Sequence, residues 1–180
     1  MVSVRSFLSY ILPVFFFTGL TALAAHAKIY LPFTPVPITL QSLAIVLAGA
    51  SLGWKRGALS QLLLISFGMI GLPVFTATQS GIDVVLGATG GYILGFILCA
   101  AVAGMMKEKG VLSSPVKSFG WLFLASLFIF LPGVIWLKTL TGMNWMDALE
   151  KGLFPFMIGD VVKTALATGV VFASAKIKRP

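Results

Sequence analysis

The sequence has few charged residues. Only 10% of its 180 residues are charged and 58% are hydrophobic, whereas a soluble globular domain is about 25% charged. This shortage of charge excludes an ordinary water-soluble domain and predicts an all-α integral membrane protein. At this length we expect a single domain with room for about six transmembrane helices of roughly 20 residues each.

Cysteine and histidine are almost missing. The one cysteine, Cys99, lies in an apolar run, which excludes an internal disulfide and is typical of a small buried side chain. The one histidine, His26, lies near the end of the first apolar segment, and we interpret it as an interface residue. The sequence contains no Walker A sequence, paired-cysteine motif or HExxH motif. It therefore predicts no metal site, no resident cofactor, no catalytic residues and no ATPase activity of its own.

Charges, glycines and prolines divide the chain into apolar segments. We expect helices at about residues 7–27, 38–53, 58–72, 86–106, 118–137 and 154–175. The segment "IYLPFTPVP" should be extended because its three prolines disfavour a helix. "GWKRG" should form a tight basic turn, and residues 138–152 a loop with a short amphipathic helix. The first segment also has features of a signal peptide, but it exceeds the usual length of about 7–15 apolar residues, which favours a retained helix.

The basic residues predict the orientation in the membrane. With six helices both termini lie on one side, together with nine basic residues and one acid, namely Arg5, Lys55, Arg56, Lys107, Lys109, Lys117, Lys176, Lys178, Arg179 and Glu108. The other side has three bases and three acids, namely Lys28, Lys138, Lys151, Asp83, Asp147 and Glu150. By the positive-inside rule, both termini are expected in the cytoplasm of a multi-pass cell-membrane protein. This asymmetry explains the net charge of +8 without nucleic acid, and it suits anionic membrane lipids.

Two charges remain inside the last apolar segment. Asp160 and Lys163 are three residues apart, so they share one face of a helix, in the outer half of the membrane. Each costs about 2.5–3.5 kcal/mol near the bilayer centre, so both should face the protein interior. Two readings stay open, an internal ion pair and a polar cavity for a ligand. An acid and a base together suit a ligand with a carboxylate and with amide or urea groups.

Other polar side chains are expected at the same outer level. They lie after the proline segment and in the Gly/Thr-rich stretch before the fourth helix, and they are Thr39, Gln41, Thr78, Gln79, Asp83, Thr89 and Tyr92. Gln61 follows the basic turn and is expected to face the cytoplasm. The sequence thus predicts an outward-facing polar pocket built from several helix ends and loops.

Small residues recur at helical spacing in the first segment. Thr18, Ala22 and Ala25 would allow close helix contact. Two readings stay open for them, packing inside the chain and docking to another membrane protein.

Several motifs resemble the BioY family, the biotin-specific S components of energy-coupling factor (ECF) transporters. The resemblance is carried by "PVPITLQ", "LAGASLGWKRGALS" and "GLPVF" within residues 28–75, and by "GATGGYILGF" and "GDVVK" further on. It implies the ECF S-component fold, a vitamin pocket near the outer surface and contacts of Asp160 and Lys163 with biotin as the transported ligand. Relatives sometimes have an asparagine after "GLPVF" and an arginine near "GGY". Here "TATQSG" leaves Thr78 or Gln79, and Lys163 is the only intramembrane cation, unless Tyr92, Thr89 and backbone groups hold the carboxylate.

The resemblance also implies partner subunits and ATP hydrolysis by those partners. It implies a transmembrane coupling subunit, with Thr18, Ala22 and Ala25 similar to the contact surface, and cytoplasmic ATPase subunits that hydrolyse ATP. Three alternatives stay open: an S component for another vitamin, a membrane-embedded enzyme with Asp160 and Lys163 as acid and base, and a scaffold in which this pair is an internal lock.

Overall fold

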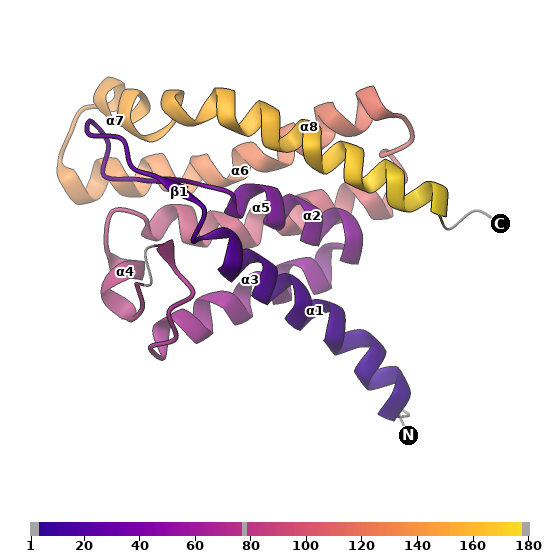
Figure 1. Ribbon diagram of the computed structural model, residues 1–180. Helices are drawn as coiled ribbons and strands as arrows, with labels where there is room; N and C mark the ends of the chain where they lie inside the picture. The colour runs from indigo at the N-terminus through magenta and orange to yellow at the C-terminus, as the bar shows by residue number, and fades with distance from the viewer. Residues whose placement is uncertain (1–3, 77–78, 178–180) are drawn as a thin grey trace.

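The fold is a bundle of helices with one short β-hairpin. The structure, a computed structural model, describes residues 4–76 and 79–177, with side chains up to Ser174. The described residues form helices α1 Val4–Ala24, α2 Gln41–Leu52, α3 Trp54–Met69, α4 Ile82–Leu86, α5 Gly90–Glu108, α6 Pro115–Thr141, α7 Trp145–Gly152 and α8 Phe154–Ile177 (Figure 1). Strand β1 (Lys28–Ile29) pairs antiparallel with β2 (Ile38–Thr39).

Helix α5 occupies the middle of the bundle. It packs against α6, α2 and α3, while α8 lies against α6 and α2, and α1 lies against α3 and α2. The core between these helices is made of aliphatic and aromatic side chains, among them Ile45, Leu64, Phe96, Ala100 and Leu122. Among the described residues, four apolar stretches are long enough to cross a membrane, namely Val4–Ala24, Gly90–Glu108, Pro115–Thr141 and Trp145–Ser174. The expected all-α membrane protein is therefore confirmed.

The proline segment explains where α2 begins. The chain between β1 and β2 is not helical, as its prolines predicted, but it forms turns and bends instead of an extended segment. Ile38 pairs with Ile29 and Thr39 with Lys28, so the helix begins only at Gln41. Helices α2 and α3 contain 12 and 16 residues, or about 18 and 24 Å at 1.5 Å per residue. Both are shorter than the roughly 20 residues of a full span.

The basic turn expected at "GWKRG" is wrong in its extent, because the turn in the structure is much shorter. Only Gly53 separates α2 from α3, at φ 85°, a conformation that favours glycine. Trp54, Lys55 and Arg56 form the first turn of α3 instead of a loop. Because Gly53 has no side chain to cap α3, Glu108 at the end of α5 does so, and its Oε1 accepts from the Trp54 N–H at 3.0 Å. A distant carboxylate thus allows a helix where the sequence suggested a turn.

Helix α6 also exceeds its expected range at both ends. It begins after Ser114, whose side chain accepts from the Lys117 N–H, and Pro115 stands in its first turn, where proline is tolerated. It ends at Gly142 in the left-handed conformation, with φ 71°. After it comes α7, the short amphipathic helix expected within residues 138–152, which Asn144 caps.

Glycines let three helices meet closely at one end of the bundle. A Cβ on Gly49 would meet the Ala103 Cβ at 2.8 Å, and a Cβ on Gly57 would meet the Gly49 Cα at 2.9 Å. A Cβ on Gly104 would meet the backbone of Gly53 and Trp54. Larger side chains at these positions would push α2, α3 and α5 apart.

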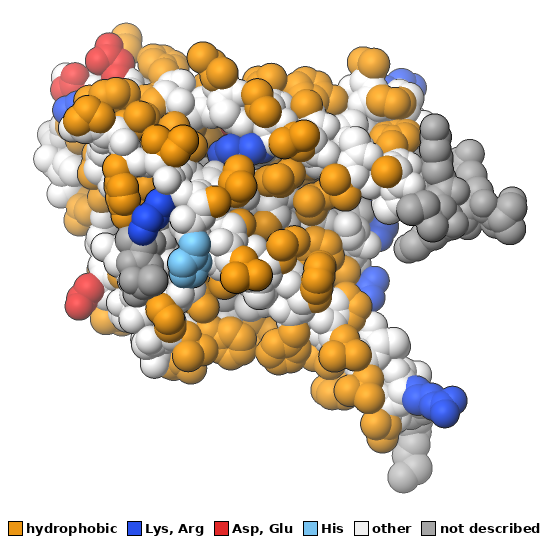
Figure 2. All heavy atoms as spheres, viewed as in Figure 1, with side chains coloured by type: hydrophobic (Ala, Val, Ile, Leu, Met, Phe, Trp, Pro, Cys, Tyr) orange, Lys and Arg blue, Asp and Glu red, His pale blue; other side chains and the backbone are white. Residues whose placement is uncertain are grey.

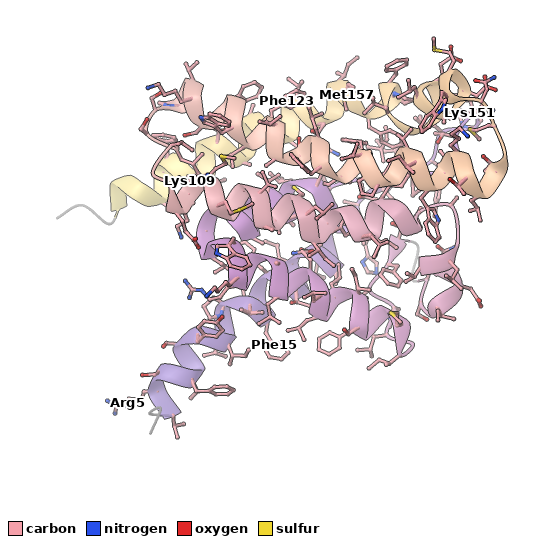
Figure 3. All side chains as sticks on the ribbon, turned by 180° about the vertical axis from the view of Figure 1, so that it is seen from behind. Arg5, Phe15, Lys109, Phe123, Lys151 and Met157 are labelled. Atoms are coloured by element: carbon pink, nitrogen blue, oxygen red, sulfur yellow. The ribbon has the colours of Figure 1, made fainter. Side chains whose placement is uncertain are left out.

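The two ends of the bundle differ in charge. Helix α1 begins and α8 ends at the same end of the molecule, whereas α4, α7 and the hairpin lie at the other end (Figure 1). Arg5 and Lys109 lie toward the first end and Lys151 toward the second (Figure 3). Hydrophobic side chains cover much of the surface between the two ends (Figure 2), as expected for a protein surrounded by lipid.

Candidate functional site

A cavity opens at the end of the bundle that holds the hairpin. Its empty space amounts to about 910 Å³, including the part that opens to solvent. Its wall comes from many segments: residues 30–42, the three residues Phe75, Thr76 and Gln79, the start of α5, the middle of α6, and α8. The fold therefore assembles one site from parts that are far apart in the sequence.

One wall of the cavity is aromatic. The ring centroids of Phe130 and Phe156 lie 5.9 Å apart, and the Tyr92 ring lies 6.3 Å from Phe130 and 6.5 Å from Phe156. Phe75 and Phe96 also line the cavity and are nearly inaccessible to solvent. This wall suits the apolar faces of a ring system or an aliphatic chain.

Tyr92 meets the cavity with its ring, because its hydroxyl is engaged elsewhere. The Tyr92 hydroxyl donates to the Gly152 carbonyl at the end of α7, at 2.9 Å. A Cβ added at Gly133 would collide with the Tyr92 ring, and one at Gly152 with its hydroxyl oxygen. Two glycines on other helices thus leave the space that the Tyr92 side chain fills.

Lys163 brings a positive charge to the cavity. From α8 its ammonium reaches the beginning of α2, where it donates to the Thr39 carbonyl at 2.8 Å and to Ser42 Oγ at 3.2 Å. An ammonium has three N–H donors, so one is left for a ligand beside these two described contacts. The first turn of α2, with Gln41 and Ser42, also lines the cavity, and the positive end of the helix dipole adds to the charge of Lys163.

Asp160 lies behind the cavity wall instead of in it. Its side chain is 1% exposed and is not among the lining residues of the cavity. It accepts a hydrogen bond from Ser126 Oγ of α6. Among the described residues, no ion pair within 4.0 Å joins Asp160 to Lys163. The two charges are close enough to influence each other, but the structure does not bring them into contact.

Further polar groups line other parts of the cavity. Gln79, Thr76 and Thr89 belong to its wall, and Gln79 is exposed. Gln41 also lines the cavity, and its Oε1 accepts from Thr39 Oγ1 at 3.3 Å. The cavity therefore offers a cation, hydroxyls and amides around an aromatic wall. Within the described part of the chain, no three His, Cys, Asp or Glu side chains gather to hold a metal ion.

Most of the residues expected at the site meet in this cavity. Lys163, Gln79, Tyr92, Thr89 and Gln41 line it together, whereas Asp160 stands behind it and Thr78 lies outside the described residues. The sequence reasoning missed Ser42, Phe130, Phe156 and Ser126. Ser42 follows Gln41 directly, but a serine or a phenylalanine inside an apolar run has no pattern that sets it apart.

Thr18 of α1 and Ala25, which directly follows α1, are turned into the bundle. Thr18 is 3% exposed and Ala25 0%, and Thr18 Oγ1 donates to the Ser60 carbonyl of α3 at 2.9 Å. This favours internal packing over docking for these two residues, whereas Ala22 is partly exposed. The expectation that Gln61 faces the cytoplasm is wrong, because this side chain is 0% exposed and its Nε2 donates to the Ser60 hydroxyl at 2.9 Å.

Comparisons with known proteins place the chain beside biotin transporters. The model of the BioY family matches residues 2–179. The "Probable biotin transporter BioY" of Pyrococcus horikoshii is 38% identical over 151 residues, covering 84% of this chain and 86% of that protein. The "Biotin transporter BioY" of Thermotoga maritima is 35% identical over 167 residues, covering 90% and 93%.

A solved structure has the same fold. It is described as the crystal structure at 2.1 Å of the S-component for biotin from an ECF-type ABC transporter. It is 26% identical to this chain and superimposes with a TM-score of 0.85 over 98% of this chain and 95% of that one. The arrangement of helices around the cavity is therefore shared with an S component.

Proposed function

The chain belongs to the BioY family, and from this membership we propose that it is the membrane-embedded biotin-binding subunit of an ECF transporter. It is a multi-pass membrane protein with a transport role and not an enzyme. The observation that carries the proposal is the cavity at the hairpin end, where one cation, Lys163, stands beside an aromatic wall.

The cavity offers apolar and polar partners for the different groups of biotin. Biotin combines a urea-containing ring, a thioether and an aliphatic chain that ends in a carboxylate. The aromatic wall would pack against the apolar parts, and the free donor of Lys163 would bind either the carboxylate or the urea carbonyl. Gln79, Thr76 and Thr89 would meet further polar groups of the ligand. A titration with biotin methyl ester distinguishes between these two contacts of Lys163.

We further propose six membrane crossings, with both termini in the cytoplasm. The four long apolar stretches supply four of them, and α2 and α3 supply two short crossings because the hairpin continues the path of α2 toward the outer side. The segregation of Arg5 and Lys109 from Lys151 (Figure 3) supports this orientation, in which the cavity opens outward. Anionic lipid head groups would then contact the basic end.

The partners would be a transmembrane coupling subunit and cytoplasmic ATPase subunits. The chain has no ATP-binding motif, so ATP hydrolysis must come from another protein. The exposed apolar side of α1, with Phe7, Phe16 and Leu23, remains available to lipid or to a coupling subunit after Thr18 and Ala25 are packed inside.

The test is equilibrium binding of labelled biotin to the purified protein in detergent. We expect saturable binding by the unaltered protein and about 10- to 100-fold weaker binding by Lys163→Ala, because a hydrogen bond to a charged group contributes about 1.5–3 kcal/mol. Lys151→Ala is the matched control, because Lys151 lies on α7 outside the cavity wall, and it should bind as the unaltered protein does.

The same titration with biotin methyl ester assigns the ends of the ligand. If Lys163 holds the carboxylate, the ester binds more weakly than biotin, and Lys163→Ala no longer distinguishes the two. If Lys163 donates to the urea carbonyl, the variant weakens both ligands equally. Absence of biotin binding, or better competition by another vitamin, would refute the proposed function.

A further inference from the structure

Ser126 is a buried polar residue with no place in the cavity. It lies on α6, is 0% exposed and is not part of the cavity wall. Helices α6 and α8 lie side by side (Figure 3), and across this contact Ser126 Oγ donates to the Asp160 carboxylate. Its alternative acceptor is the Phe123 carbonyl on its own helix, 2.7 Å away. The serine therefore has a local partner and still reaches the carboxylate of another helix.

Ser42 and Asp160 both act on the Lys163 ammonium. The Ser42 hydroxyl accepts from this ammonium at 3.2 Å. Asp160 precedes Lys163 by three residues on α8, so the two side chains share one helix face and their opposite charges attract. The position of the Asp160 carboxylate therefore influences where the ammonium lies.

Lys163 needs such support because its side chain is long and flexible. A ligand group is bound well only if the ammonium is already in position, since ordering it at the moment of binding weakens the affinity. Burying a carboxylate such as Asp160 costs free energy unless a hydrogen-bond donor compensates for the water that it loses. Ser126 supplies that donor from a third helix and limits the positions that the carboxylate can take.

We propose that Ser126 is a positioning residue of the ligand site: it holds the Asp160 carboxylate, which with Ser42 places the Lys163 ammonium at the cavity. This inference rests on the proposed biotin binding, but it concerns a residue that does not touch the ligand. In metal sites, residues that do not touch the metal orient its ligands in a comparable way, and replacing them has large effects on the affinity for the metal.

The test is a double-mutant cycle on biotin affinity in the full-length purified protein. Ser126→Ala should weaken biotin binding about 3- to 10-fold, as expected for the loss of one hydrogen bond. In the Lys163→Met background the same change should alter the affinity less than about 2-fold, because the group that Ser126 positions is gone. A residue that only stabilises the fold would have equal effects in both backgrounds.

Ser118→Ala is the matched control. Ser118 is on the same helix and is also 0% exposed, but its Oγ has no hydrogen-bond partner in the described part of the chain. We expect this variant to keep the affinity of the unaltered protein. If Ser126→Ala does not fold, Ser126→Cys takes its place in the cycle, because a thiol is a much weaker hydrogen-bond donor than a hydroxyl.

Equal effects of Ser126→Ala with and without Lys163, or an unchanged affinity in the single variant, would overturn the inference. So would an equal loss in Ser118→Ala. These outcomes leave biotin binding by the unaltered protein intact, so they are distinguishable from a failure of the proposed function, in which the unaltered protein binds no biotin.

Discussion

Tyr92 shows how single residues shape the cavity. Its ring packs near Phe130 and Phe156, and its hydroxyl is bound to the Gly152 carbonyl. Gly133 leaves room for the ring and Gly152 for the hydroxyl. A ring held in this way would lose little conformational entropy when a ligand packs on it, so we expect these glycines to contribute to binding although they carry no side chain.

Gly133→Ala tests this role. The added methyl group would collide with the Tyr92 ring, so we expect the free energy of unfolding to fall by about 1–3 kcal/mol and biotin binding to weaken. Gly120→Ala is the control on the same helix, because a Cβ there meets nothing within 4 Å. Thermal unfolding in detergent and biotin titration measure the two effects. Equal stability of both variants would contradict the packing described here.

At the scale of elements, the link between α3 and α5 decides where α3 begins. Glu108 caps the first turn of α3 from the end of α5, and the Lys107 ammonium next to it donates to the Ser51 carbonyl in α2. Together with the close packing of Gly104 against Gly53, these contacts fasten the α2–α3 corner to α5. Three helices are thereby joined at the end opposite the cavity.

Glu108→Ala should lower the free energy of unfolding by about 0.5–2 kcal/mol, the usual effect of losing a helix cap. Glu108→Gln keeps an oxygen that accepts from the Trp54 N–H and should restore most of the loss. Glu150→Ala removes an exposed acid of α7 and should leave stability unchanged. Denaturation in detergent checks all three. A glutamine variant as unstable as the alanine variant would show that charge and not capping is responsible.

The whole molecule has a basic end, an apolar middle and a cavity end. Helix α1 diverges from the bundle at the basic end (Figure 1), and residues 4–10 are all exposed. Because apolar residues dominate this stretch, lipid or another membrane protein is the environment that would cover it. In the proposed orientation, the cavity and the basic end lie on opposite sides of the membrane.

Labelling with a membrane-impermeant maleimide tests this orientation. Cys99 is the only cysteine and is fully buried, so Cys99→Ala provides a background without reactive thiols. In intact cells we expect label on Glu150→Cys, at the cavity end, and none on Ser113→Cys, in the loop before α6, until the membrane is opened. Biotin binding by each variant confirms that it is folded. The reverse pattern would contradict cytoplasmic termini.

Some of this organisation was predictable from the sequence for physical reasons. The lack of charge predicted the membrane protein, the prolines predicted that residues 30–37 are not helical, and the charges of "GDVVK" predicted that the last helix faces a polar interior. Local patterns carry these features. The number of crossings, the orientation and the ligand contacts stay predictions.

Contacts between distant residues were not predictable in this way. The cap of Glu108 on α3 depends on a residue 54 positions away, and Ser126 reaches Asp160 across 34 positions. Spacing alone placed Asp160 and Lys163 on one helix face. It did not show that Lys163 reaches the cavity while Asp160 stays behind the wall, because that difference is set by the helices packed against them.

The bond from Lys163 to the Thr39 carbonyl connects binding to kinetics. Thr39 belongs to β2, so the ammonium that we propose binds the ligand also anchors the hairpin that lines the cavity. A ligand that draws the ammonium toward itself would loosen this anchor, whereas one that leaves it in place would keep the hairpin fastened. Residence time and affinity would then be set in part by the same side chain, and ligands of equal affinity would differ in how quickly they leave.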